Sequence, residues 1–429
     1  MPADDFVPGI LLGSLAALVG GALVSESCRR RAFLRMLLPG LLLWRFGVFL
    51  FLVLWALPYY AEGRADAIAY HIKGLEAATA IRAGAWDRLR WEFGTPAFVI
   101  WTGLLYAPFG GNLTALYFVS MFVGLGAAIS LYKAFALFGA PRQTRVYGLM
   151  MFFLPSYSMW TSIHGKDSWV GLGLGLSAHG YGLWLRGKAA KGVARLAAGM
   201  LVILVFRPHI AFLVAVAFLV SQVLFYGTAK AASWVQGTLT LVVLAAMLLG
   251  VGHLAKGFVG LQEVSVGAAL ARNDVGARGN AYGGSAVEYR PALSVTEVIR
   301  GLPAGIVKVL FRPFLWEAHN FNAALAAVEN AWLVLFSLRR LGSLGRLVKH
   351  LIRQPYWTFS TALAIELVLV YSSTTNLGLL SRMRAQLLPF FLVPLVGFED
   401  ARCCRVVPGR VPHPSGYPNA VNKPSGLNL

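Results

Sequence analysis

Charged residues are scarce in this chain of 429 residues, and acidic ones are scarcest. Only 13% of its residues are charged, about half the share usual in soluble proteins, while 57% are hydrophobic. Its three cysteines, Cys28, Cys403 and Cys404, show neither metal-ligand spacing nor a disulfide pattern. The composition therefore excludes an ordinary soluble domain, and the cysteines point to no redox or metal centre.

What the chain has instead is a series of apolar runs, several of which reach the ~20 residues of helix that cross a bilayer. The sequence predicts an all-α polytopic membrane protein with about 11 transmembrane helices, in a range of about 10–13. The apolar segment 95–109 is short and is predicted to be a re-entrant or interfacial helix. The predicted spans are residues 6–24, 33–60, 112–132, 146–163, 168–186, 194–206, 209–226, 235–255, 322–337, 355–372 and 386–398.

The segments between these spans fall into two sets of unequal charge. One set carries 21 of the 38 basic residues and three acidic ones, whereas the other carries 16 basic and 13 acidic residues. The positive-inside rule makes the first set cytoplasmic, which puts the N-terminus outside and the C-terminus in the cytoplasm. A transmembrane domain is then expected over 1–398, with outer loops 61–111 and 256–321, followed by a disordered cytoplasmic tail, 399–429. The basic excess suits anionic lipid headgroups better than nucleic acid.

Five polar stretches fall on the predicted outer face: residues 63–96, 162–169, 205–212, 256–321 and 373–389. The first is predicted to form surface helices, and Pro208 is predicted to separate two short spans that meet at a vertex. These stretches hold the cations Lys166, Arg207, His209, Arg312, Arg382 and Arg384 and the carboxylates Asp66, Asp167 and Glu317. Polar groups at membrane depth are candidates for function. An excess of cations suits an anion such as the phosphate of a polyprenyl-linked sugar.

Each stretch also has a plainer interpretation. Arginine and lysine near helix ends often extend to the membrane interface without binding anything. Asp66 and Asp167 each precede a helical pattern, so either carboxylate is also a candidate helix cap. The glycines of GLGLGL, residues 171–176, are expected to let membrane helices pack closely rather than to bind a nucleotide.

Several short motifs occur in a particular order along the chain. Asp66, Tyr70 and His71 come first, followed by YAPFGGN, KAFALFGAPRQ and a segment with Pro, Ser and then Gly-Lys-Asp; LFRPFLWE and NLGLLSRMRAQLLP come last. Over roughly residues 60–395 this order resembles the GT-C class of membrane glycosyltransferases and the related bacterial exopolysaccharide and O-antigen polymerases. The resemblance implies glycosyl transfer from a polyprenyl-(pyro)phosphate donor at the outer face of the bacterial cytoplasmic membrane, in envelope polysaccharide biosynthesis.

The resemblance also implies roles for individual residues. It makes Asp66 the catalytic base, with Glu317 as the reserve candidate, and it places the donor phosphate against Lys166, Arg207, Arg382 and Arg384. His209 and Arg312 join this phosphate-binding set on charge, and further candidates are His71, His164, Asp167, Asn376 and Gln386. A single aspartate stands where such families carry an Asp-x-Asp pair, so neither a metal nor another cofactor is expected. The expected partners are a polyprenyl-linked saccharide, anionic lipids and other envelope polysaccharide proteins.

Two other functions remain open at this point. A flippase or exporter of lipid-linked oligosaccharide would favour internal repeats and charges at the membrane midplane. No internal repeat is evident, and away from their ends the predicted spans contain only three charged residues, Arg45, Glu329 and Glu366. A non-catalytic membrane scaffold of the same pathway would not need so many cations on the outer face.

Overall fold

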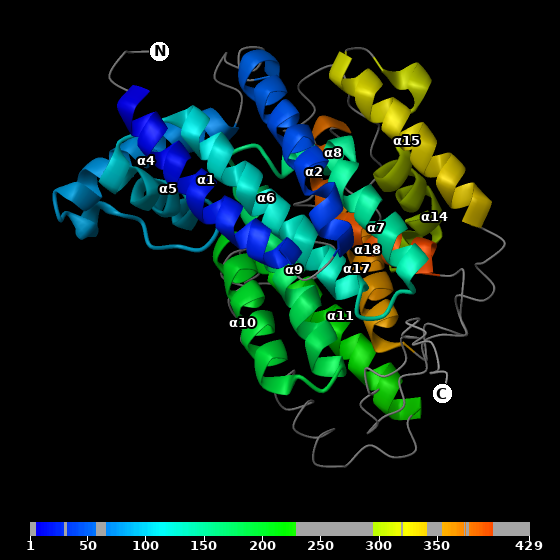
Figure 1. Ribbon diagram of the computed structural model, residues 1–429. Coiled ribbons are helices and arrows are strands. Elements are labelled where there is room, and N and C mark those ends of the chain that lie inside the picture. The colour runs from blue at the N-terminus through cyan, green and yellow to red at the C-terminus, as the bar shows by residue number, and fades with distance from the viewer. Residues whose placement is uncertain are drawn as a thin grey trace, which may run out of the picture.

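The computed structural model describes residues 6–29, 32–56, 66–228, 295–318, 321–340, 354–372, 374 and 377–397. Within these ranges the chain is helical and contains no strand. The helices pack into one body, with α4 and α5 standing out to one side (Figure 1). The predicted all-α class is therefore confirmed for the described residues. The predicted span 235–255, most of loop 256–321 and the tail 399–429 lie outside them.

The described residues up to Thr228 form ten α-helices and two short helical turns. They are α1 (Phe6–Arg29), α2 (Ala32–Phe51), the π-helical turn η2 (Leu52–Ala56), α4 (Asp66–Arg82), the 3-10 turn η3 (Trp86–Arg88), α5 (Thr95–Phe109), α6 (Leu113–Phe135), α7 (Pro141–Phe153), α8 (Pro155–Trp160), α9 (Lys166–Leu185), α10 (Ala189–Phe206) and α11 (Pro208–Thr228). The second half adds α14 (Val295–Phe311), the 3-10 turn η4 (Leu315–Glu317), α15 (Phe321–Arg340), α17 (Pro355–Tyr371) and α18 (Leu377–Gly397).

Among the described residues, four helical segments are long and apolar enough to cross a membrane: Ala32–Ala56, Leu113–Phe135, Ala189–Phe206 and Leu377–Gly397. Shorter apolar helices cover Leu11–Ala22, Thr95–Phe109 and Pro208–Leu224. These helices give the protein the character of a membrane protein. The larger number of crossings predicted from the sequence, and their orientation, go beyond this finding.

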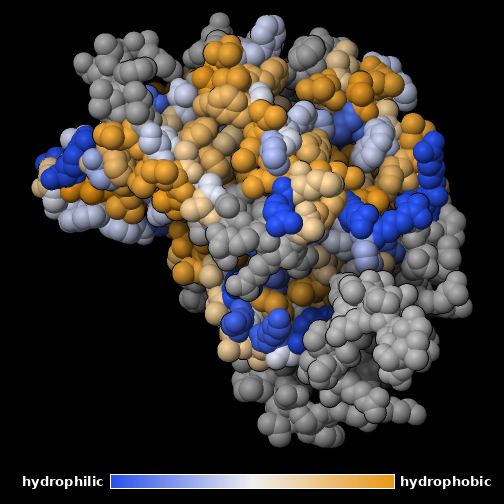
Figure 2. All heavy atoms as spheres, in the orientation of Figure 1, coloured by the Kyte–Doolittle hydropathy of each residue, from blue (hydrophilic) through white to orange (hydrophobic). Residues whose placement is uncertain are grey.

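The exterior and interior of the body show the distribution of side chains expected in lipid. Leu43 and Leu54 are 72% and 71% exposed, whereas the guanidinium of Arg45, between them on the same helical segment, is fully buried. Arg45 donates to the Ser158 carbonyl and to the hydroxyl of Thr161. Figure 2 shows hydrophobic residues spread over the visible face. A surface this apolar needs a hydrocarbon environment or another cover.

Helix α9 lies between α6 and α10 at the centre of the body. A methyl group added to Gly173 would lie 2.8 Å from the Gly199 carbonyl oxygen, and one added to Gly199 would lie 2.5 Å from the Gly173 carbonyl oxygen. Only glycine allows α9 and α10 to approach so closely. The expectation that GLGLGL serves helix packing is confirmed for this pair.

Several predicted boundaries differ from the observed ones. The single span predicted at 146–163 is wrong, because the chain breaks between α7 and α8 at Leu154, which is extended before Pro155. Helix α14 lies within the segment that was predicted to be the outer loop 256–321. The last helix begins at Leu377, nine residues before the predicted span 386–398.

Candidate functional site

Helix α9, which is largely buried, begins with a lysine and an aspartate, Lys166 and Asp167. Gly165 is extended, and α9 begins at Lys166. The carboxylate of Asp167 thus lies near the positive end of the helix dipole. The interpretation of Asp167 as the helix cap is wrong, because Gly165 occupies the cap position and no side chain caps this helix end.

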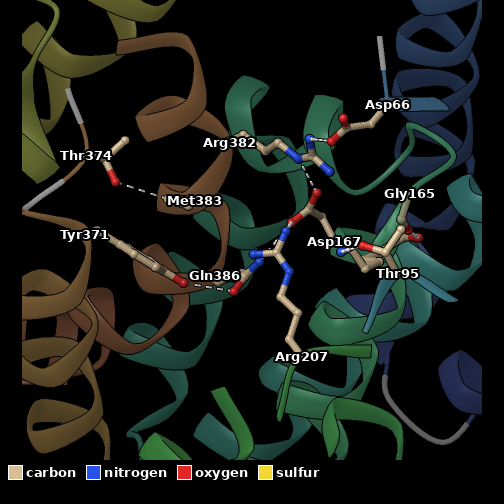
Figure 3. Close-up of polar contacts among 12 residues, drawn as sticks. Asp66, Thr95, Gly165, Asp167, Arg207, Tyr371, Thr374, Arg382, Met383 and Gln386 are labelled. Atoms are coloured by element: carbon tan, nitrogen blue, oxygen red, sulfur yellow. Dashed lines mark hydrogen bonds and ion pairs between the residues drawn. The ribbon is translucent and has the colours of Figure 1, made fainter. Parts of the chain in front are cut away.

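Asp167 is the centre of a buried network of hydrogen bonds (Figure 3). Its Oδ1 accepts from Arg207 at 2.7 Å and from the Gln386 amide at 2.8 Å, and its Oδ2 accepts from Nε of Arg382. Asp167 is only 3% exposed. Burial raises its pKa, but the two guanidinium groups outweigh this effect and leave the pKa below its usual value. Asp167 is therefore an ionised anchor for two cations.

Arg382 extends this network to the surface. Its NH1 group donates to Asp66 at the start of α4, so one guanidinium joins two carboxylates. The Asp66 side chain is 57% exposed, whereas that of Arg382 is 15% exposed. Behind them, Gln386 accepts a hydrogen bond of 2.9 Å from the Tyr371 hydroxyl of α17. The network runs from the helical interior to a carboxylate that solvent or a ligand can reach.

Arg207 owes its place to the proline that follows it. Helix α10 ends at Phe206 and α11 begins at Pro208, since proline lacks the amide hydrogen needed to continue a helix. The predicted vertex between two short helices is confirmed. Close to it, the Val205 carbonyl accepts from the Gly94 amide at 2.8 Å, which fixes the start of α5 beside the end of α10.

Of the three cations Lys166, Arg207 and Arg382, Lys166 is the one without an ion pair among the described residues. Its Nζ donates to the Thr95 hydroxyl at 3.0 Å and lies 6.0 Å from the centre of the Tyr70 ring. Burial and the neighbouring Arg207 lower the pKa of Lys166 to about 8. Two carboxylates and three cations meet here, so the group carries one net positive charge, centred on Lys166.

We call Asp66, Lys166, Asp167, Arg207 and Arg382 the polar cluster. Four separate parts of the chain supply it: the starts of α4 and α9, the α10–α11 break and the first turns of α18. These five belong to the nine charged residues that the sequence places together; hydrogen bonds join four of them to one another, while Lys166 bonds to Thr95. The prediction did not include Thr95, Tyr70 and Tyr371 as contacts of the cluster, because hydroxyl groups next to apolar runs give no distinctive sequence signal.

A second group of predicted residues forms a different cluster. Arg312 makes an ion pair with Glu317, which also accepts from the Phe314 amide at 2.9 Å. Arg384 donates to the Leu310 carbonyl at 3.1 Å and to the Arg312 carbonyl at 2.5 Å. These contacts hold the corner between α14 and η4. The structure thus joins Arg312, Glu317 and Arg384 to one another at this corner.

The histidine candidates lie around the polar cluster. His164 is buried against Thr102 and Phe98, and burial lowers its pKa to about 3, so it is neutral. His71 is 2.7 Å from the Tyr106 hydroxyl, and His209 lies in the first turn of α11 beside Arg207. Asn376 lies outside the described residues. Among the described residues, no group of three or more His, Cys, Asp or Glu side chains has the arrangement of a metal site.

A cavity of about 1700 Å³ adjoins the polar cluster. Residues of α4, the segment 88–93, the first half of α5 and Val205 line it, and Thr95 is part of its wall. Since Thr95 also holds Lys166, the cavity wall and the unpaired cation share one contact. The site therefore combines a localised positive charge with an adjacent space for a ligand.

No protein-family model, curated protein or solved structure matches this chain. The polar cluster and its surroundings therefore carry the functional conclusion.

Proposed function

We propose that the protein is a membrane glycosyltransferase or polysaccharide polymerase that uses a polyprenyl-(pyro)phosphate-linked sugar donor. The observation that carries this proposal is Lys166, a cation held by Thr95 beside a network in which Asp167 neutralises its neighbours. The negative charge of a donor phosphate would offset the one net positive charge of the polar cluster. Rigid, partly buried cations stabilise a leaving phosphate far better than cations in water do.

In the proposed reaction a hydroxyl oxygen of the acceptor attacks the anomeric carbon of the donor sugar. The bond between that carbon and the phosphate oxygen breaks, and the phosphate leaves with the electron pair. Asp66, the exposed carboxylate of the cluster, takes the hydroxyl proton, a role worth about 10²–10⁴-fold in rate. Lys166 binds the leaving phosphate, and Arg382 orients Asp66 through their ion pair.

The proposal includes a membrane topology. The chain crosses the bacterial cytoplasmic membrane about eleven times, as the lengths of its apolar runs suggest. The polar cluster then faces outward, the N-terminus lies outside and the C-terminus lies in the cytoplasm. The donor, anionic lipids and other envelope polysaccharide proteins are the proposed partners.

Cysteine labelling tests this topology with two exposed positions. In a variant whose three cysteines are replaced by serine, Ala83→Cys after α4 should react with an impermeant thiol reagent in intact cells. Ala190→Cys, near the start of α10, should react only after the membrane is permeabilised. Both positions are exposed in the structure, so burial cannot explain a difference. The reverse pattern would show that the polar cluster faces the cytoplasm.

A reconstituted assay separates glycosyl transfer from transport. Purified protein in liposomes would receive polyprenyl-linked saccharides extracted from the source membranes. Transfer releases the free lipid (pyro)phosphate and joins saccharides, whereas a flippase moves the intact donor across the bilayer and releases nothing. Movement of intact donor without release of lipid phosphate would refute the proposed reaction.

We expect the transfer rate to fall as the pH rises through the pKa of Lys166. The ammonium, with its pKa of about 8, is almost fully charged at pH 7 and mostly neutral at pH 9. Because the charged form binds the donor phosphate, the rate at low donor concentration should drop about tenfold between these pH values. Lys166→Arg, which stays charged, should remove this dependence. An equal fall in Lys166→Arg would assign the titration to another group.

A further inference from the structure

The cavity beside the polar cluster is larger than a site for a single small molecule requires. Pockets for small ligands usually measure about 300–1,000 Å³, whereas this one measures about 1700 Å³. It lies along α4 and the segment that returns from α4 to α5, away from the centre of the helical body (Figure 1). A ligand that fills it would be large, and it would pass Thr95, whose hydroxyl holds Lys166 on the other side of the wall.

The lining of the cavity mixes flat apolar surface with hydrogen-bonding groups of both signs. Ala77 and Ala80 of α4 and Ala83 just after it belong to the lining, together with Trp91 of the returning segment. The charged residues of the lining are Lys73, Glu76, Arg88, Arg90 and Glu92. Trp91 stacks on Trp86, with ring centroids 6.4 Å apart, and is still 67% exposed, so the ring face turned away from Trp86 is available to a ligand.

This chemistry argues against two classes of occupant. A lipid chain favours a lining without charges, yet five charged residues border this cavity, and Figure 2 shows hydrophilic residues interleaved with hydrophobic ones on the projecting lobe. A polyanion favours a clear excess of cations, yet the three basic residues face two acidic ones, and Arg90 pairs with Glu92 at 2.6 Å. A chain of sugar units fits better, since it presents hydroxyl groups at its edges and apolar faces to an aromatic ring.

We propose that this cavity binds the acceptor saccharide over several sugar units and delivers its terminal hydroxyl to the polar cluster. The inference rests on the proposed function and makes it more specific, since an enzyme that holds several units of its acceptor acts on a growing chain. Trp91 stacks on a sugar face, and Glu76 and Arg88 bind hydroxyl groups. The hydrogen bond from the Gly94 amide to the Val205 carbonyl fixes the cavity wall next to Arg207.

The test measures saccharide binding without donor. Oligosaccharides of one to about six units would be prepared by partial hydrolysis of the source cell's surface polysaccharide. They would be titrated against the full-length protein in nanodiscs and followed by saturation-transfer NMR. Affinity should increase with the number of sugar units, and Trp91→Ala should weaken binding of the longest saccharide about tenfold, the loss expected for one aromatic contact. The matched control is Trp316→Ala, a tryptophan that is 78% exposed outside the cavity and should leave binding unchanged.

Three results would overturn the inference: no binding, equal affinity for one unit and for several, or an effect of Trp316→Ala as large as that of Trp91→Ala. A fluorophore on Ala83→Cys that is quenched by brominated lipid chains and is insensitive to saccharide would assign the cavity to lipid instead.

Lys166→Ala should keep full saccharide binding, because Lys166 contacts only the cavity wall. If saccharide binds but Lys166→Ala retains full transfer activity, the cavity assignment stands and the proposed role of the polar cluster fails.

Discussion

Replacing Lys166 with alanine should reduce glycan product more than about 100-fold, the usual cost of removing one preorganised contact to a developing negative charge. Among the described residues, Lys166 is the cation of the polar cluster that makes no ion pair with a carboxylate, so its charge is the one left for a donor phosphate. Its side chain is tied to the rest of the protein by one hydrogen bond to Thr95. The protein level should therefore stay near wild type while activity is lost.

The measurement is polymer or transferred sugar in a deletion strain that expresses each variant. Lys166→Arg should restore only part of the product, because a planar guanidinium does not reproduce the position of a compact ammonium group. Lys188→Ala is the matched control, since Lys188 is exposed between α9 and α10 at the other end of α9. Full product from Lys166→Ala would mean that this lysine only extends to the membrane interface, as the plainer interpretation of the sequence holds.

The sequence was sufficient to predict that the polar cluster exists. The charge difference between the two sets of connecting segments places Asp66, Lys166, Asp167, Arg207 and Arg382 on one side, and the contacts agree. The order of apolar spans and loops along the chain is enough to predict which loops share a side, because this prediction does not depend on how the helices pack. The break at Pro208 was equally predictable, since it depends on the backbone of one residue.

The pairing of charges within that face was not predictable. The sequence suggested six cations open to a donor phosphate, whereas Arg207, Arg382 and Arg312 are held by carboxylates and Arg384 by carbonyl groups. Such pairs join residues far apart in the chain, as Asp66 and Arg382 do, and depend on side-chain reach between packed helices. Glu317 is a local exception, because its ion-pair partner Arg312 is only five residues away in the chain.

The prediction that follows for Asp167 is the reverse of what a capping role implies. Asparagine caps a helix almost as well as aspartate, so Asp167→Asn would be mild if the side chain were a cap. Because Asp167 instead holds Arg207 and Arg382, the substitution leaves two guanidinium groups with insufficient negative charge in a buried place. Removing one partner of a buried ion pair typically costs about 3–5 kcal/mol. We therefore expect Asp167→Asn to lower both the amount of folded protein and its melting temperature in detergent.

A second substitution distinguishes this charge effect from a general intolerance of the position. Arg207→Gln removes one of the two uncompensated cations, so the double variant Asp167→Asn/Arg207→Gln should recover part of the lost stability while staying inactive. Arg207 is 9% exposed and its guanidinium donates directly to Asp167, so the two changes act on one interaction and should not be additive. Additive destabilisation would contradict the ion-pair explanation. Partial recovery of folding without recovery of product would show that Asp167 stabilises the site through its ion pairs and that activity depends on at least one of these two residues beyond their effect on stability.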